Sequence, residues 1–105
     1  MIHHVVFFQL KEEVDAPIVE TVVRTSRSLL MKIPEVLSIR SGRNLDPASP
    51  WSVFLAIEVD SLDKLRIVQD SPYHLQFMEK FIKPNVDNQL EMNFELDPSK
   101  NLKYS

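Results

Sequence analysis

Proline divides this chain more than any other residue type. The sequence has seven prolines and a single glycine, Gly42. Because proline fixes φ and has no N–H group, it is excluded from helix interiors and from central strands. Regular elements must therefore lie between the prolines. With 105 residues there is room for one core, and we assign residues 1–97 to one domain and residues 98–105 to a polar C-terminal tail.

Four segments have the pattern of β-strands. Residues 2–10 are rich in β-branched and aromatic side chains, and residues 89–96 alternate between apolar and polar side chains. Residues 36–43 and 52–60 are two further strand-like runs, joined by a polar loop that contains prolines. We therefore expect four strands, with the middle two paired antiparallel.

Two helical regions separate these strands. Residues 17–32 repeat apolar side chains at helical spacing, and Asp15 is placed to cap the first turn. The second region, residues 61–82, is divided into two helices at Ser71-Pro72, because serine caps a helix and proline suits its first turn. The order strand-helix-strand-strand-helix-strand predicts an α+β, ferredoxin-like fold, in which the helices cover one face of an antiparallel sheet.

The predicted sheet has apolar side chains on both faces. In the first strand Val6 and Phe8 point one way while Val5 and Phe7 point the other way, and the third strand alternates in the same manner. Helices cover only one face, so the other face is an apolar patch of the kind that marks an interface. We expect a homodimer that packs sheet to sheet. Its predicted interface residues are His3, Val5, Phe7, Trp51, Phe54 and Ala56.

Composition argues against several classes of function. The chain has no cysteine, which rules out disulfides and a cysteine nucleophile. Its net charge is −3 with scattered basic residues, so we expect no nucleic-acid partner. No apolar run approaches the ~18 residues of a membrane span, so we expect no membrane partner and a cytoplasmic location. His3 and His4 diverge on a strand, so we expect no metal site, and no cofactor is indicated.

Four segments share their order and spacing with one known family. They are MIHHVVFFQLK at residues 1–11, IPEV at 33–36, GRNL at 42–45, and SPYHLQF at 71–77 followed by Pro84. Together they resemble the stress-responsive A/B barrel domain, or dimeric α+β barrel, over residues 2–96. The resemblance implies a ferredoxin-like protomer whose sheet packs on a second copy to form a barrel. It also implies a small, mostly apolar pocket between sheet and helices in each protomer.

The resemblance also points to site residues. One family member is a polyketide cyclase whose Pro-x-His histidine is oriented by a tyrosine six residues earlier; His74 matches that histidine, but Val68 replaces the tyrosine. His4 matches a first-strand histidine of that enzyme, whereas Ser26 and Val53 replace its other pocket tyrosine and a third-strand histidine. The candidate catalytic residues are His74, as general acid/base, and His4, as a carbonyl-positioning group. The expected pocket residues are Val6, Phe8, Val22, Ser26, Val53, Leu55, Ile57, Val68 and Phe77.

Three functions fit this sequence. The first, which we favour, is a homodimer that binds a small apolar or β-keto molecule in that pocket. The second is a lyase or polyketide-cyclase-like enzyme, because buried imidazoles have lowered pKa values and can act as bases near neutral pH. The third is a stress-linked structural dimer without a ligand, in which His74 buttresses a helix and His4 is a core histidine. A cavity below a few hundred Å³ would favour the third function.

Overall fold

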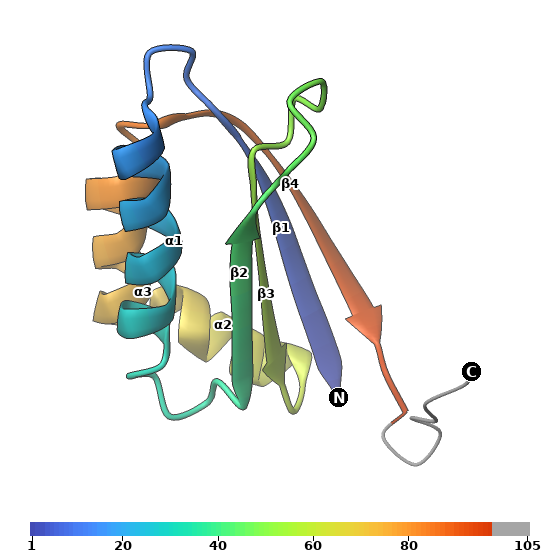
Figure 1. Ribbon diagram of the computed structural model, residues 1–105. Coiled ribbons are helices and arrows are strands. Elements are labelled where there is room, and N and C mark those ends of the chain that lie inside the picture. The colour runs from blue at the N-terminus through green and yellow to red at the C-terminus, as the bar shows by residue number, and fades with distance from the viewer. Residues whose placement is uncertain (98–105) are drawn as a thin grey trace.

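The chain folds into two layers, a four-stranded antiparallel sheet and a layer of helices on one of its faces (Figure 1). The computed structural model describes residues 1–97, so the predicted tail at residues 98–105 lies outside the described residues. The elements in chain order are β1 (Ile2–Leu10), α1 (Ala16–Leu30), β2 (Ser38–Arg43), β3 (Val53–Val59), α2 (Leu62–Asp70), α3 (Pro72–Phe77), the π-helix η1 (Met78–Ile82) and β4 (Val86–Glu95). The predicted ferredoxin-like fold is confirmed. Among the described residues, no helix is long and apolar enough to cross a membrane.

The helices begin where side-chain caps predict. Asp15, Ser61 and Ser71 each accept a hydrogen bond from a backbone N–H two or three residues later, at 3.1, 3.2 and 3.3 Å. The end of the last helical region differs from the prediction, because α3 continues as a π-helix closed by a hydrogen bond from Lys83 N to Met78 O at 2.8 Å. A π-turn inserts one residue into a helix and leaves no regular trace in the apolar spacing.

β1 occupies the interior of the sheet. The strand order is β2-β3-β1-β4, so β1 pairs antiparallel with β3 on one side and β4 on the other. β4 begins earlier than the predicted strand, and its register with β1 shifts between Gln9 and Leu10. The predicted antiparallel pairing of β2 with β3 is confirmed.

Buried and half-buried side chains alternate along β1, as the sequence predicts. The buried set faces the helices and consists of Ile2, His4, Val6 and Phe8. These side chains join residues from β3 and the helices in one core, in which Leu30, Val59 and Val68 have no exposed surface. We call the helix-covered side of the sheet the inner face. Its core side chains are therefore buried by elements of the same protomer.

β4 is apolar on the opposite side. Its side chains Leu90, Met92 and Phe94 lie opposite Phe7, Val5 and His3 of β1, so they share the face that the helices leave uncovered, the outer face. Polar side chains of β4 alternate with them and share the inner face with His4: Gln89, Glu91, Asn93 and Glu95.

The outer face carries an apolar patch that crosses three strands. This outer patch consists of Val5, Phe7, Phe54, Leu90, Met92 and Phe94. Phe54, Leu90 and Phe94 are 37%, 42% and 48% exposed. Ala56, which was expected to be part of the exposed patch, is only 4% exposed, because its register places it between Val5 and Arg40, whose longer side chains flank it.

Candidate functional site

The two candidate catalytic histidines meet at a small cavity between the inner face and the helices. His4 comes from β1 and His74 from α3, and both line it. The cavity has a volume of about 20 Å³, which is the space of about one water molecule. Its remaining lining is mostly apolar: Val6, Phe8, Leu30, Leu55, Ile57, Leu65, Val68 and Met78, with Gln69, Gln89 and Glu91 as the polar members.

His4 is fixed by a side chain of β4. It is 4% exposed, and its Nδ1 lies 2.6 Å from Asn93 Oδ1. An amide oxygen only accepts, so Nδ1 carries the proton and donates it in this bond. The neutral imidazole then has an unprotonated Nε2, which can accept a hydrogen bond or take up a proton. Asn93 was not among the predicted site residues, because only the β1–β4 register brings it next to His4.

The Nδ1 of His74 lacks a comparable partner. This nitrogen is buried and has no hydrogen-bond partner among residues 1–97. Burial lowers the pKa of His74 below its usual value, and the nearby His4 lowers it further. A hydrogen bond with the main chain of Gln69 and the negative charges of Glu91 and Asp70 act in the opposite direction without reversing the shift. The fold therefore favours the neutral imidazole, which is the form that can act as a base near neutral pH.

The cavity collects some of the predicted pocket residues and not others. Val6, Phe8, Leu55, Ile57 and Val68 line it. Val22, Val53 and Phe77 do not, because they are buried elsewhere in the same core, with exposures of 1%, 3% and 1%. Ser26 is also absent from the lining; its hydroxyl donates to the main-chain oxygen of Val23 at 2.7 Å and lies 2.8 Å from the hydroxyl of Ser41. It therefore ties α1 to β2.

The predicted interface residues lie on or beside the outer face, where Ala56 is the one that is buried. His3, Val5 and Phe7 are half-buried on β1, and Trp51 packs beside Phe7 with ring centroids 6.4 Å apart. His3 Nδ1 lies 3.8 Å from Glu58 Oε1, which is too long for a hydrogen bond. Within residues 1–97, no three histidine or carboxylate side chains gather closely enough to hold a metal ion.

The fold has close counterparts among solved structures. A dimeric ferredoxin-like protein of unknown function from Thermobifida fusca is 26% identical, with a TM-score of 0.82 and 90% of each chain covered. A dabb family protein from Mesorhizobium loti is 21% identical, with a TM-score of 0.78 and coverage of 90% of this chain and 95% of that one. A hydroxynitrile lyase from Passiflora edulis is 19% identical, with a TM-score of 0.78 and coverage of 92% and 94%. The likeness to these last two shows the fold alone.

The sequence itself identifies the family. No curated protein matches it as a relative. The model of the stress-responsive A/B barrel domain, however, matches residues 2–96, which is almost the whole described chain. The order of elements, the inner cavity between sheet and helices, and the uncovered outer face all accompany that match. The chain therefore belongs to the stress-responsive A/B barrel domain family.

Proposed function

We propose that this chain works as a homodimer that binds a small, mostly apolar molecule at the His4–His74 cavity. The observation that carries the proposal is the unpartnered Nδ1 of His74, buried at a cavity whose other walls are mostly apolar. A buried polar atom without a partner costs about 1–3 kcal/mol. A ligand with one hydroxyl group on an apolar body would donate a hydrogen bond to this nitrogen and fill the remaining space.

The volume of about 20 Å³ is below a few hundred Å³ and by itself favours the structural dimer without a ligand. Ligand binding therefore requires the cavity to open, and one side of it can do so. Gln89 and Glu91 are exposed side chains at the cavity, so they can swing into solvent. Met78, the first residue of η1, is half-buried in the wall, and an unbranched methionine adapts to a new shape at low cost. Entry between β4 and η1 therefore requires side-chain movement only.

The outer patch supports the homodimer. Apolar side chains from β1, β3 and β4 form one surface that no element within residues 1–97 covers, and large surfaces of this kind mark interfaces. The Thermobifida fusca protein, which has the same fold, is described as dimeric. Packing two outer faces together would bury the patch and produce the barrel that gives the family its name.

Ligand binding at the cavity is tested by titrating the protein with benzyl alcohol, phenol and toluene while recording the imidazole signals of His4 and His74 by NMR. We expect the two hydroxyl compounds to shift both imidazoles saturably, and toluene, which has no polar group, to bind at least about tenfold more weakly. His74→Phe should abolish the difference, because it removes the unpaired nitrogen. Leu75→Ala, on an exposed residue of the same helix, should leave it unchanged. No saturable shift with any compound would favour the structural dimer without a ligand.

The paired histidines favour a second function, an acid–base lyase or cyclase. In its neutral form His4 presents an unprotonated Nε2, because Nδ1 donates to Asn93, and the lowered pKa of His74 favours the neutral form of that ring. Two neutral imidazoles can take a proton from one atom and return it to another. One structural counterpart is named a hydroxynitrile lyase, so mandelonitrile cleavage is a direct assay.

In that assay we expect His74→Gln and His4→Gln each to lower the rate by at least about a hundredfold. His3→Gln, on the adjacent residue of the outer face, should retain the rate. Activity that survives in the His74 variant, or none above background in the parent protein, would exclude this chemistry.

A further inference from the structure

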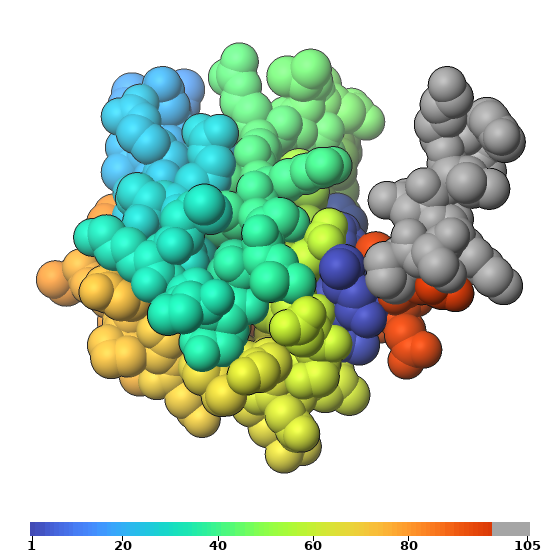
Figure 2. Space-filling model, turned by 90° about the horizontal axis from the view of Figure 1, so that it is seen from below, coloured from blue at the N-terminus to red at the C-terminus, as the bar shows by residue number. Residues whose placement is uncertain are grey.

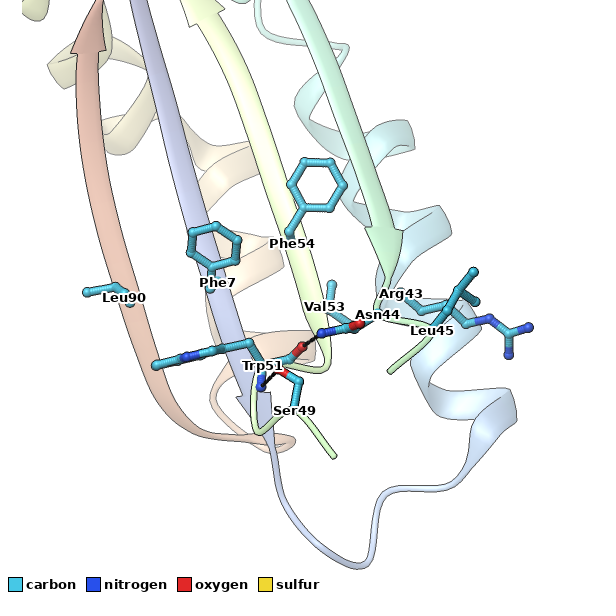
Figure 3. A pocket seen from close by; sticks show the side chains of 9 residues that line it. All are labelled: Phe7, Arg43, Asn44, Leu45, Ser49, Trp51, Val53, Phe54 and Leu90. Atoms are coloured by element: carbon cyan, nitrogen blue, oxygen red, sulfur yellow. Dashed lines mark hydrogen bonds between the residues drawn. The ribbon is translucent and has the colours of Figure 1, made fainter. Parts of the chain in front are cut away.

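A much larger recess than the histidine cavity lies on the outer face, under the β2–β3 loop (Figure 3). Its volume is about 460 Å³, against about 20 Å³ for the histidine cavity. Pockets that hold a drug-sized molecule are typically ~300–1,000 Å³. By size, the outer recess is therefore the better ligand site of the two.

Aromatic rings from three segments surround this outer recess. Phe7 comes from β1, Phe54 from β3 and Trp51 from the loop before β3. Figure 3 shows the two phenylalanine rings standing on neighbouring strands, and the Trp51 ring extending toward Leu90 of β4. The rings of Phe7 and Trp51 are tilted at 56° with centroids 6.4 Å apart. Aromatic side chains in such positions can contact a flat apolar ring of a ligand in offset-stacked or tilted geometry.

The loop that carries Trp51 is held in place by its own hydrogen bonds. Asn44 Nδ2 donates to Trp51 O at 2.9 Å, and Asn44 Oδ1 accepts from Asp46 N at 2.8 Å. Ser49 Oγ accepts from Trp51 N at 3.2 Å, and Ala48 N donates to Asp46 Oδ1 at 2.9 Å. The recess is thus formed before any ligand arrives, and a preformed site loses less entropy on binding.

The space between the rings holds no charged group from the described part of the chain. Within residues 1–97, Arg43 is the one charged residue in the lining, and Figure 3 shows its guanidinium directed away from the rings. The register explains this direction, because Arg43 is paired with the inner-facing Val53. The hydroxyl of Ser49 at the rim can still donate one hydrogen bond. A ligand that fits is therefore flat, aromatic and uncharged, with at most a small polar group at its edge.

We propose that the outer recess is a second binding site, for a planar, uncharged aromatic molecule, and that the partner's sheet closes it in the dimer. Phe7, Phe54 and Leu90 belong to both the recess and the outer patch, so the site is continuous with the proposed interface. The closure rests on the proposed homodimer. Because a ligand enclosed by two protomers binds the dimer more tightly than the monomer, it must strengthen dimerisation by the same factor.

The site is tested with N-phenyl-1-naphthylamine, an uncharged aromatic fluorophore. Trp51 is the single tryptophan of the chain, so energy transfer from tryptophan to the probe reports binding to the domain, and a variant that fills the recess shows whether the probe is bound there. We expect saturable transfer in the parent protein. Ser49→Phe places a ring in the recess and should weaken binding at least about tenfold.

Two control variants distinguish the effect of filling the recess from the effect of disturbing the loop. Ser49→Ala removes the acceptor for Trp51 N but leaves the recess open, and Ala48→Phe adds the same ring on a loop residue outside the lining. Both should bind within about threefold of the parent protein. An equal loss in Ala48→Phe, or no saturable transfer in the parent, would overturn the site.

The closure is tested by sedimentation with and without the probe. We expect the dissociation constant of the dimer to fall at least about fivefold at saturating probe. A dimer that the probe leaves unchanged or weakens would overturn the closure and leave the homodimer standing. A chain that stays monomeric throughout would refute the homodimer and the closure together. Energy transfer from Trp51 in the parent protein, and its loss in Ser49→Phe, would still decide whether the recess binds.

Discussion

The two faces of the sheet bury their apolar side chains to different extents. On the inner face, Phe8 and its neighbours are buried under the helices, and the cavity beside His4 and His74 is about 20 Å³. On the outer face, Phe54, Leu90 and Phe94 keep 37–48% of their surface exposed, next to a recess of about 460 Å³. The apolar side chains of the inner face are thus buried within one chain, around the cavity of His4 and His74. Those of the outer face stay partly exposed, where a partner molecule can contact them.

Neighbouring phenylalanines on opposite faces give the most direct test of this contrast. We expect Phe8→Ala to lower the free energy of unfolding by about 3–5 kcal/mol, because a buried ring leaves a cavity. Phe7→Ala should cost less than about 2 kcal/mol, since its ring is only half-buried in the protomer. Urea denaturation of both variants, at concentrations where the chain is monomeric, makes the measurement. Equal losses would mean that the outer face is as tightly packed as the inner one.

A charge on the outer face should act on assembly and not on folding. We expect Phe94→Lys to raise the dissociation constant of the dimer at least about 30-fold, the effect of losing about 2 kcal/mol at an interface hot spot. Sedimentation equilibrium measures it. Leu75→Lys, on an exposed leucine of α3, serves as the matched control. If both lysines weakened the dimer equally, the interface would not be the outer face.

Removing the partner of His4 should have a smaller effect, confined to the inner face. Asn93→Ala leaves the Nδ1 of a buried histidine without its hydrogen bond. We expect the free energy of unfolding to fall by about 1–2 kcal/mol. Glu95→Ala, two residues further along the same face of β4, has no such partner to expose, so its urea midpoint should match that of the parent protein. If Asn93→Ala left the free energy of unfolding unchanged, water would replace the amide as the partner of His4 without cost.

The smallest effect should be the acid sensitivity of His74. Because its pKa is lowered in the folded state, the unfolded chain binds the proton more readily. The stability that this histidine contributes is therefore fully present above the unfolded pKa of about 6.5 and is lost as the pH falls toward the lower folded value. His74→Gln should reduce the slope of stability between about pH 7 and about pH 5. A parent protein whose urea midpoint rises on acidification would contradict this sign.

Local signals were sufficient for most of the fold. Asp15 marks the start of α1 because a cap acts within one turn, and alternation assigns the faces of β1 because the strand period is two. The π-helix η1 and the burial of Ala56 were not predictable in this way. The first depends on one inserted residue in a helix, and the second on which side chains stand beside a small residue in two other strands.

The site was only half predictable for the same reason. His4 and His74 were named from the resemblance to the family, and the structure brings them to one cavity. Asn93 lies 89 residues from His4 in sequence, so only the register of β4 connects them. Ser26 and Phe77 were expected at the pocket, but the rotation of a helix about its axis decides which side chain reaches a cavity, and the apolar pattern alone does not define it closely enough.

The pairing of β1 with β4 has a consequence for how the domain is made. The first strand carries apolar side chains on both faces, and it lies between two strands that are synthesised later. Until β3 is translated it has no partner, and until β4 follows, one of its edges stays open. An unpaired apolar strand readily adds to other chains. The period of greatest aggregation risk is therefore set by translation, and a chain truncated before residue 86 would keep that edge open permanently.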